Sequence, residues 1–172
     1  MTSPFSHQDP SIMTDSPEIQ RLAAASRQLL IGAEEADRAF GPRTAQGAEE
    51  VEEWAHSATW DLSEAFEVAW SESAEEDLAT LDRLAAEWGE MPDEDALLQI
   101  ALTWGSFLGE RITAAAGGSW VYREDPLHDA LHFPRQKVEF FPMHAILARF
   151  LIGSQAGIEA GYHQLVEFLT SS

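Results

Sequence analysis

The chain has 172 residues and no cysteine, and its 30 Asp and Glu against 10 Lys and Arg give a formal net charge of −20 at pH 7. This length suffices for one hydrophobic core, and the lack of cysteine excludes disulfides, a cysteine nucleophile and cysteine-ligated zinc while fitting a cytoplasmic location. Such acidity repels nucleic-acid phosphates and anionic membranes and attracts basic proteins, so we expect no direct nucleic-acid binding and no membrane association.

The negative charge is concentrated in the first half of the chain. Residues 1–96 carry 23 of the 30 acidic residues but five of the ten basic ones. Residues 1–15 are rich in Ser, Pro, Asp and Thr and hold no apolar run of signal-peptide length, so we expect a mobile tail. Residues 16–172 then form a single domain, with an acidic helical layer over 16–91 and a core helix, a small sheet and C-terminal helices over 92–172.

The first helix is expected to begin at Ser16-Pro17-Glu18. Here a hydroxyl can cap free amides, proline needs no donor, and an acid lies near the positive end of the helix dipole. Apolar residues then recur at helical spacing from Ile19 to Ala36, and Gly41-Pro42 stops the pattern. We expect one amphipathic helix over this range.

A second helical region follows Gly47. Its apolar positions keep the helical period while most of its glutamates fall on the other side. These positions are Val51, Trp54, Ala58, Leu62, Ala65, Phe66, Ala69 and Trp70. Asp61 with Glu64, and Ser73 with Glu76, match capping boxes, so a break into two or three helices stays open.

The most hydrophobic helix opens at Pro92-Asp93-Glu94-Asp95 and contains Gly105 and Gly109. A glycine inside a helix costs about 1 kcal/mol relative to alanine. Close approach of another backbone would offset this loss, so we expect a strand or a helix to lie closest at these two positions.

Three strands are expected after this helix, over residues 119–123, 130–133 and 137–141, because apolar side chains alternate there with a period of two. Pro142 suits the first turn of a helix running to Ile152, and a final helix follows Gly153-Ser154. The sequence therefore predicts an α+β fold that is mainly helical, with about six helices and a small three-stranded antiparallel sheet in the C-terminal half.

Three short motifs in this region resemble a family of small bacterial α+β domains of unknown function. They are Leu108-Gly109-Glu110, Gly117-Gly118-Ser119-Trp120 and Phe140-Phe141-Pro142, and the resemblance covers roughly residues 97–165. It implies an α+β fold and no established activity. Some related domains occur beside bacterial toxin systems, which mildly favours an immunity role.

Candidate catalytic and metal-binding residues are few. His128 and His132 are flanked by Asp125 and Asp129, but on a strand four residues span about 13 Å, which is too far for two ligands of one ion. On a helix the two imidazoles would share a face, although we favour the strand and expect no metal and no cofactor. Glu110 is expected to form a salt bridge near Arg111 or Arg123 rather than to act as a buried acid.

Nucleophile, phosphate-binding and dinucleotide-binding motifs are absent from the sequence, so no catalytic residue is predicted and we expect a protein that is not an enzyme.

Trp60 is the most informative residue of the acidic region. On a continuous helix it shares a side with Glu53, Glu64 and Glu67, opposite the apolar stripe, and an aromatic ringed by acids is a good anchor for a basic partner. The alternative is that Asp61 caps a new helix and Trp60 folds back on Ala65 as a hydrophobic staple.

The sequence thus favours a non-enzymatic acidic protein-binding domain whose partner-binding residues are Trp60, Glu53, Glu64 and Glu67. An immunity or inhibitor protein for a basic toxin or nuclease is the sharpest form of this hypothesis. The alternative is a structural or assembly subunit of a bacterial complex, in which the apolar stripe mediates self-association.

Overall fold

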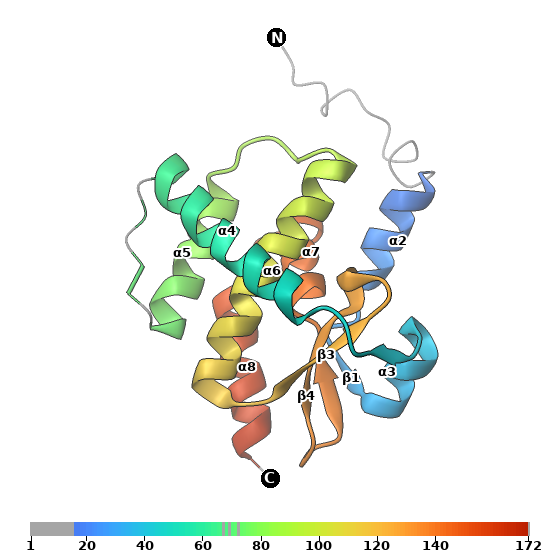
Figure 1. The fold of residues 1–172 in the computed structure, drawn as a ribbon. Coiled ribbons are helices and arrows are strands. Elements are labelled where there is room, and N and C mark those ends of the chain that lie inside the picture. Colours follow the sequence, from blue (N-terminus) through green and yellow to red (C-terminus); the bar gives the residue numbers. More distant parts are fainter. Residues whose placement is uncertain (1–15, 67, 69, 72, 172) are drawn as a thin grey trace.

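The computed structural model describes residues 16–66, 68, 70, 71 and 73–171, and within them it has seven α-helices and a five-stranded sheet (Figure 1). The expected tail, residues 1–15, lies outside the described residues. The helices are α2 (Pro17–Ala25), α3 (Ala33–Phe40), α4 (Ala48–Phe66), α5 (Ala74–Ala86), α6 (Glu94–Ala116), α7 (Pro142–Leu151) and α8 (Ile158–Thr170), with short 3₁₀ turns η2 (Pro126–His128) and η3 (Ser154–Ala156). The strands are β1 (Leu30–Gly32), β2 (Arg43–Thr44), β3 (Ser119–Arg123), β4 (Ala130–Phe133) and β5 (Val138–Phe140). The α+β class is confirmed.

Two of the helix starts are fixed by the capping residues that the sequence supplies. The Ser16 hydroxyl accepts a hydrogen bond from the Ile19 amide at 3.4 Å and caps α2. Asp93 caps α6 by accepting from the Ala96 amide at 2.8 Å. Ser73 is the N-cap residue of α5, as its capping box predicted, but its side chain forms no cap hydrogen bond.

The sheet has five strands in the order β1-β5-β4-β3-β2, and every neighbouring pair is antiparallel. The central meander β3-β4-β5 is the predicted one, with β3 and β4 at their expected bounds. The prediction of a three-stranded sheet is wrong because two strands from the N-terminal half flank this meander. The N-terminal half of the chain therefore supplies both edges of the sheet.

The expected single helix from Ile19 to Gly41 is also wrong. The chain leaves α2 after Ala25, pairs Leu30 with Phe140 in β1, and becomes helical again in α3. Leu30 packs on the main core while Ile31 packs on a second, smaller core under α3. A strand that is apolar on both faces gives a continuous apolar run, which periodicity does not distinguish from a buried helix.

Helix α6 lies at the centre of the molecule and packs against both α4 and α7. A Cβ atom added at Gly105 would lie 2.7 Å from the Met143 Cα atom in α7, and one added at Gly109 would overlap the Trp120 indole of β3. The expected close approach of another backbone is therefore confirmed at Gly105, whereas at Gly109 the close neighbour is the Trp120 side chain.

Helix α4 crosses over α6 and runs without a break from Ala48 to Phe66 (Figure 1). Its apolar stripe faces inward, with Val51, Ala58 and Leu62 all buried. The capping box expected at Asp61 therefore does not start a helix, because this residue lies inside α4. Among the helices described, none combines the length and apolar character that a membrane span requires.

The first testable prediction concerns Gly105. Gly105→Ala should destabilise the domain by about 1–3 kcal/mol, because its methyl group would overlap the backbone of α7. Gly161→Ala in α8 is the matched control, since no heavy atom lies within 4 Å of the added Cβ, and helix propensity should make it neutral or stabilising. Urea unfolding of both variants measures the difference, and equal stabilities would contradict the close packing of α6 on α7.

Candidate functional site

The outward face of α4 carries the residues that the sequence singled out. Trp60 is 60% exposed, and Glu53 and Glu64 are exposed on the same helix. At 3.6 residues per turn these three side chains fall within about 40° of one another around the helix axis. Glu67 lies outside the described residues. We call Glu49, Glu53, His56, Trp60 and Glu64, all of them exposed, the Trp60 face.

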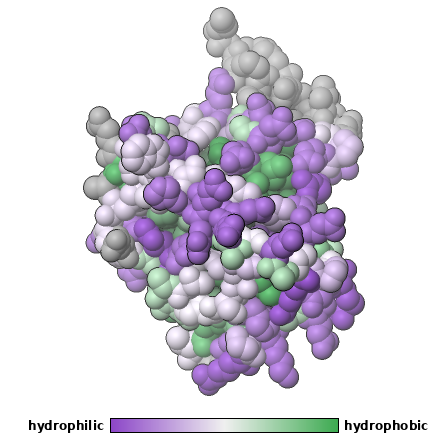
Figure 2. Space-filling model, in the orientation of Figure 1, coloured by the Kyte–Doolittle hydropathy of each residue, from purple (hydrophilic) through white to green (hydrophobic). Residues whose placement is uncertain are grey.

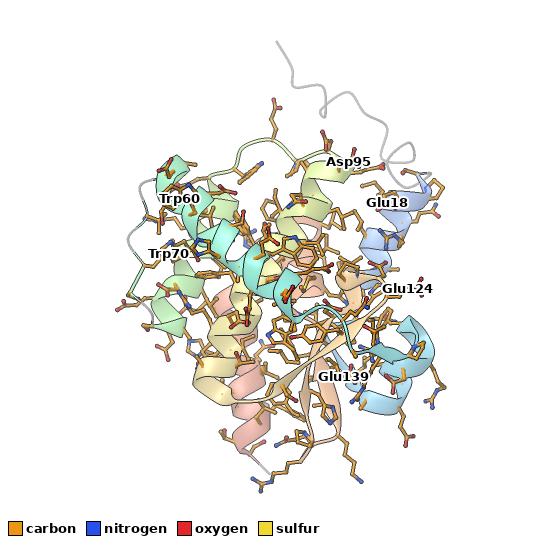
Figure 3. The ribbon with its side chains drawn as sticks, in the orientation of Figure 1. Glu18, Trp60, Trp70, Asp95, Glu124 and Glu139 are labelled. Carbon is orange, nitrogen blue, oxygen red and sulfur yellow. The ribbon has the colours of Figure 1, made fainter. Side chains whose placement is uncertain are left out.

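The alternative role of Trp60 as a hydrophobic staple is wrong. A staple needs a helix N-terminus directly after Trp60, whereas α4 continues through Asp61 to Phe66. The Asp61 carboxylate accepts a hydrogen bond from the Ser57 hydroxyl one turn earlier at 3.3 Å, instead of capping free amides. Trp60 therefore projects from within α4, in the C-terminal half of the helix, where Figure 3 labels it.

The carboxylates of α4 have no basic partner within the described part of the chain. The helix carries six acidic residues and neither Lys nor Arg, and none of its acids takes part in an ion pair with a described residue. Arginines elsewhere pair with acids of other elements; they are Arg21, Arg43, Arg111, Arg123 and Arg149. Hydrophilic side chains accordingly gather over α4 in Figure 2. The negative charge of the α4 carboxylates is therefore not neutralised by an ion pair with any described residue.

A buried ion-pair network lies on the face of the sheet that α3 covers. The Arg123 guanidinium lies 2.8 Å from Glu139 and 2.6 Å from Asp37, and neither the Arg123 nor the Glu139 side chain is exposed. Arg43 reaches the other Glu139 oxygen at 2.8 Å. The remaining Arg123 donors bind the carbonyls of Gly41 at 3.0 Å and His128 at 3.1 Å. The network therefore ties β2, β3 and β5 to α3.

Sequence reasoning missed this network, although a signal was present. Within the predicted strands, Arg123 and Glu139 lie at positions that alternate with the large apolar residues Tyr122 and Phe140. The alternation does not show which element of the structure covers that face of the sheet. Asp37 and Ala36 of α3 arrive from a segment about a hundred residues away in sequence and bury it.

A pocket of about 270 Å³ opens between the start of α4 and the connection that follows β3. Three carboxylic acids line it, namely Glu50 in the first turn of α4, Glu124 and Asp129. Glu124 is labelled in Figure 3, beyond the N-terminal end of α4 and away from Trp60. We call this the acidic pocket. Gly47 also lines it and adopts a φ of +136°, with Tyr122 packed where a side chain would lie.

Asp129 is the unusual member of the acidic pocket. The residue is 1% exposed, and its Oδ1 atom accepts a hydrogen bond from the Arg123 amide at 2.8 Å. Burial raises the pKa of Asp129 to about 7, and the neighbouring Glu50 carboxylate adds to the rise. The carboxyl group therefore exchanges its proton near neutral pH, unlike an ordinary surface aspartate.

The candidate metal-binding histidines are separated by the fold. His128 lies in η2, where its Nδ1 is 2.9 Å from the Nε2 of His144, whereas His132 lies in β4 opposite Glu139. The His144 Nδ1 faces the Gln28 carbonyl at 2.8 Å and so donates to it, and burial lowers the pKa of His144 to about 3. Within residues 16–66, 68, 70, 71 and 73–171, no group of three or more His, Asp and Glu side chains could hold a metal ion.

Glu110 does not form the expected salt bridge. Its carboxylate accepts a hydrogen bond from the Trp120 indole N–H at 3.1 Å, and the residue is partly exposed. The Arg111 side chain instead pairs with Asp77 of α5 at 2.9 Å. Glu110 therefore helps to hold the Trp120 indole of β3 against α6, which is a structural role.

Comparisons with protein-family models, with curated proteins and with solved structures found no match for this chain. The geometry and charge of the α4 surface are therefore the basis on which we infer a function.

The second testable prediction concerns the buried network. Glu139→Gln should destabilise the domain by about 3–5 kcal/mol, because it leaves the Arg123 guanidinium buried without its full counter-charge. Glu18→Gln breaks the exposed pair with Arg21 and should cost less than about 1 kcal/mol. Chemical unfolding of the two variants tests this, and a Glu139→Gln protein as stable as Glu18→Gln would contradict the role of the network.

The third prediction concerns the pH dependence of stability. Raising the Asp129 pKa from 3.8 to about 7 on folding corresponds to about 4 kcal/mol. This contribution is fully present below pH 3.8 and is lost as the pH rises through about 7, since the folded state holds its proton longer. Asp129→Asn keeps an acceptor for the Arg123 amide and does not titrate.

The stability of Asp129→Asn relative to wild type should therefore increase between pH 4 and 8, by up to about 4 kcal/mol. Glu124→Gln at the exposed rim of the same pocket is the control, and its effect should stay within about 0.5 kcal/mol. Unfolding free energies measured across this pH range check the difference. A constant difference between Asp129→Asn and wild type would show that Asp129 ionises as an ordinary carboxyl.

Proposed function

We propose that this protein is a non-enzymatic acidic binding domain that engages a basic protein through the Trp60 face, with Trp60, Glu53, Glu64 and Glu67 at the contact. One observation carries this proposal. A tryptophan that is 60% exposed projects from a helix whose carboxylates form no ion pair with any described residue. A soluble protein gains nothing for its own fold from this combination, whereas a binding surface uses both parts of it.

The two parts act at different stages of binding. Clustered carboxylates attract a basic surface over a distance of about 10 Å at 0.1 M salt and raise the association rate. Trp60 then supplies the apolar area that a charged surface lacks, and tryptophan is enriched among the residues that dominate binding energy. The acids thus set the rate of encounter, while the indole sets the lifetime of the complex.

The inward face of α4 supports this function over self-assembly. Val51, Ala58 and Leu62, the stripe that an assembly subunit would use, are buried against the core of the same chain. An assembly role would therefore need another surface. The motifs in residues 97–165 resemble a bacterial family of which some members occur beside toxin systems, which mildly favours a basic toxin or nuclease as the partner. An immunity or inhibitor role is the sharpest form of the proposal.

The fourth prediction tests the Trp60 face with the partner captured from the source organism. Trp60→Ala should weaken binding at least about 30-fold, the equivalent of about 2 kcal/mol, mainly by speeding dissociation. Phe168→Ala is the matched control, because Phe168 is 42% exposed on α8, away from α4, and its loss should leave affinity unchanged. Surface plasmon resonance measures both rates.

The same experiment tests the acids. Glu53→Gln combined with Glu64→Gln should lower the association rate, and raising the salt should lower the wild-type rate about tenfold or more. Binding that is equally strong in Trp60→Ala, or an association rate indifferent to salt, would count against this function.

A further inference from the structure

We infer that a groove between α4 and α6, beside the Trp60 face, receives apolar side chains from a basic amphipathic helix of the partner. This inference rests on the proposed function, and it adds the class of partner segment and a second contact. Three features of the groove lead to it: its apolar walls, the single sign of the charges on the segments that form it, and its place next to Trp60.

The groove has a volume of about 330 Å³ and lies between two helices that pack on each other. One wall is the side of α4 that carries Ala58, Leu62 and Ala65, and the other is the N-terminal half of α6. Trp88, just after α5, also lines it, and its ring meets that of Trp104 edge to face with centroids 5.9 Å apart. Ligand pockets range upward from about 300 Å³, so this apolar groove suits side chains better than a large ligand.

The groove adjoins the Trp60 face on the same helix. Around the axis of α4, Glu64 lies about 40° from Trp60, and Asp61, which lines the groove, lies about 100° from it. Ala65 follows at about 140° in the same direction and also lines the groove. A segment that contacts Trp60 therefore reaches the groove across one edge of α4.

The segments that form the groove carry acidic residues and neither Lys nor Arg. This holds for α4 and for residues 84–110, which span Trp88 and the α6 wall. Figure 3 labels Trp60 and Asp95, one on each of the two helices, both in the upper part of the view. The exposed acids on these segments form no ion pair with a described residue; those next to the wall residues in sequence are Asp61, Glu64, Glu87, Glu90, Asp93 and Asp95. Charge complementarity therefore favours a segment with Lys or Arg beside its apolar residues.

The walls favour a helix over an extended segment. An extended segment gains affinity from main-chain hydrogen bonds to a free sheet edge, whereas an amphipathic helix binds a groove through apolar side chains at i, i+3, i+4 and i+7. Both walls are helices, whose main-chain groups bond within the helix, and no strand lines the groove. The partner therefore binds here through side chains, which an amphipathic helix presents on one face.

The segments of this chain itself are poor occupants of the groove. A second copy brings the same acidic surface and a net charge of −20, so two copies repel each other. Residues 1–15 contain two Asp and neither Lys nor Arg, so they offer no charge that complements the groove. A basic partner is the occupant that fits both the apolar walls and the charge.

The fifth prediction uses the full chain and designed peptides, so it does not need the natural partner. A helical peptide with Leu at i, i+3, i+4 and i+7 and Lys elsewhere should bind saturably, and NMR should show shifts of the Trp88 indole N–H and of the Ala65 and Ala96 amides. The amide of Ala115, exposed near the other end of α6, should not shift. A peptide with Ser in place of Leu keeps the charge and should bind at least about tenfold more weakly, because it loses the apolar contact.

Substitutions on the two walls test the groove directly. Ala65→Gln combined with Ala96→Gln fills the groove from both sides without changing the net charge, and both alanines are exposed helix residues that tolerate glutamine. This double substitution should weaken binding of the Leu peptide at least about tenfold. Ala115→Gln is the matched control and should leave the affinity unchanged.

A second pair of variants tests the charges and leaves the walls intact. Glu87→Gln combined with Glu90→Gln should lower the association rate of the Leu peptide at low salt. Glu34→Gln combined with Glu35→Gln on α3 removes the same charge from a helix that does not line the groove, and its effect should be smaller.

Four outcomes would overturn the groove assignment. Two are equal binding of the Leu and Ser peptides, and binding that Ala65→Gln with Ala96→Gln leaves unchanged. A dimer of the full chain that this double substitution dissociates would assign the groove to a second copy. Nuclear Overhauser contacts of the Ala96 methyl group with Phe5 or Ile12 in the free protein would assign it to residues 1–15.

None of these results affects the Trp60→Ala test of the proposed function, because the groove variants leave Trp60 in place. Groove binding without an effect of Trp60→Ala on the captured partner would instead reject the Trp60 face and keep the groove.

Discussion

The Arg123 guanidinium is the constraint on which the arrangement of this fold depends. It is fully buried, so each of its donors must find an acceptor within the protein. The acceptors are Asp37 in α3, the Gly41 carbonyl after α3 and the His128 carbonyl in η2, and the guanidinium also forms an ion pair with Glu139 in β5. This one side chain thereby links β3, which carries it, to β5, α3 and η2 on the face of the sheet that α3 covers. The same strand end donates the Arg123 amide to Asp129, so the geometry of the acidic pocket is inherited from this network.

Basic residues are distributed within the chain in a way that matches this use of Arg123. Arginines are scarce, and those at Arg21, Arg43, Arg111, Arg123 and Arg149 pair with acids that join distant elements. Five of the ten basic residues thus form internal ion pairs, while α4 carries no Lys or Arg. Its apolar stripe holds it to α6, so the opposite face contributes little to folding and is open to selection for binding.

The parts of the fold that local signals determine could be predicted from the sequence. Ser16, Asp93 and Pro142 mark helix starts through capping, and alternation located β3 and β4 at their observed bounds. The exposed position of Trp60 also followed from helical periodicity. The rest depends on distant pairing. Leu29 to Ile31 fits a helix or a strand, and only pairing with β5 decides between them. The acidic pocket was missed for the same reason, since Glu50 and Asp129 meet through the tertiary fold.

The flanking strands β1 and β2 have a consequence for the order of folding. Both edges of the sheet are formed by short segments from the first 44 residues, and Leu30 pairs with Phe140. During synthesis these segments leave the ribosome long before their partners exist. β2 can pair only after β3 has been made, and β1 only after β5 has been made. The sheet therefore closes only when most of the chain has been made, and the meander on its own would expose two unpaired edges that favour aggregation. The early acidic helices keep that waiting chain strongly charged, which helps to hold it in solution until the edges are covered.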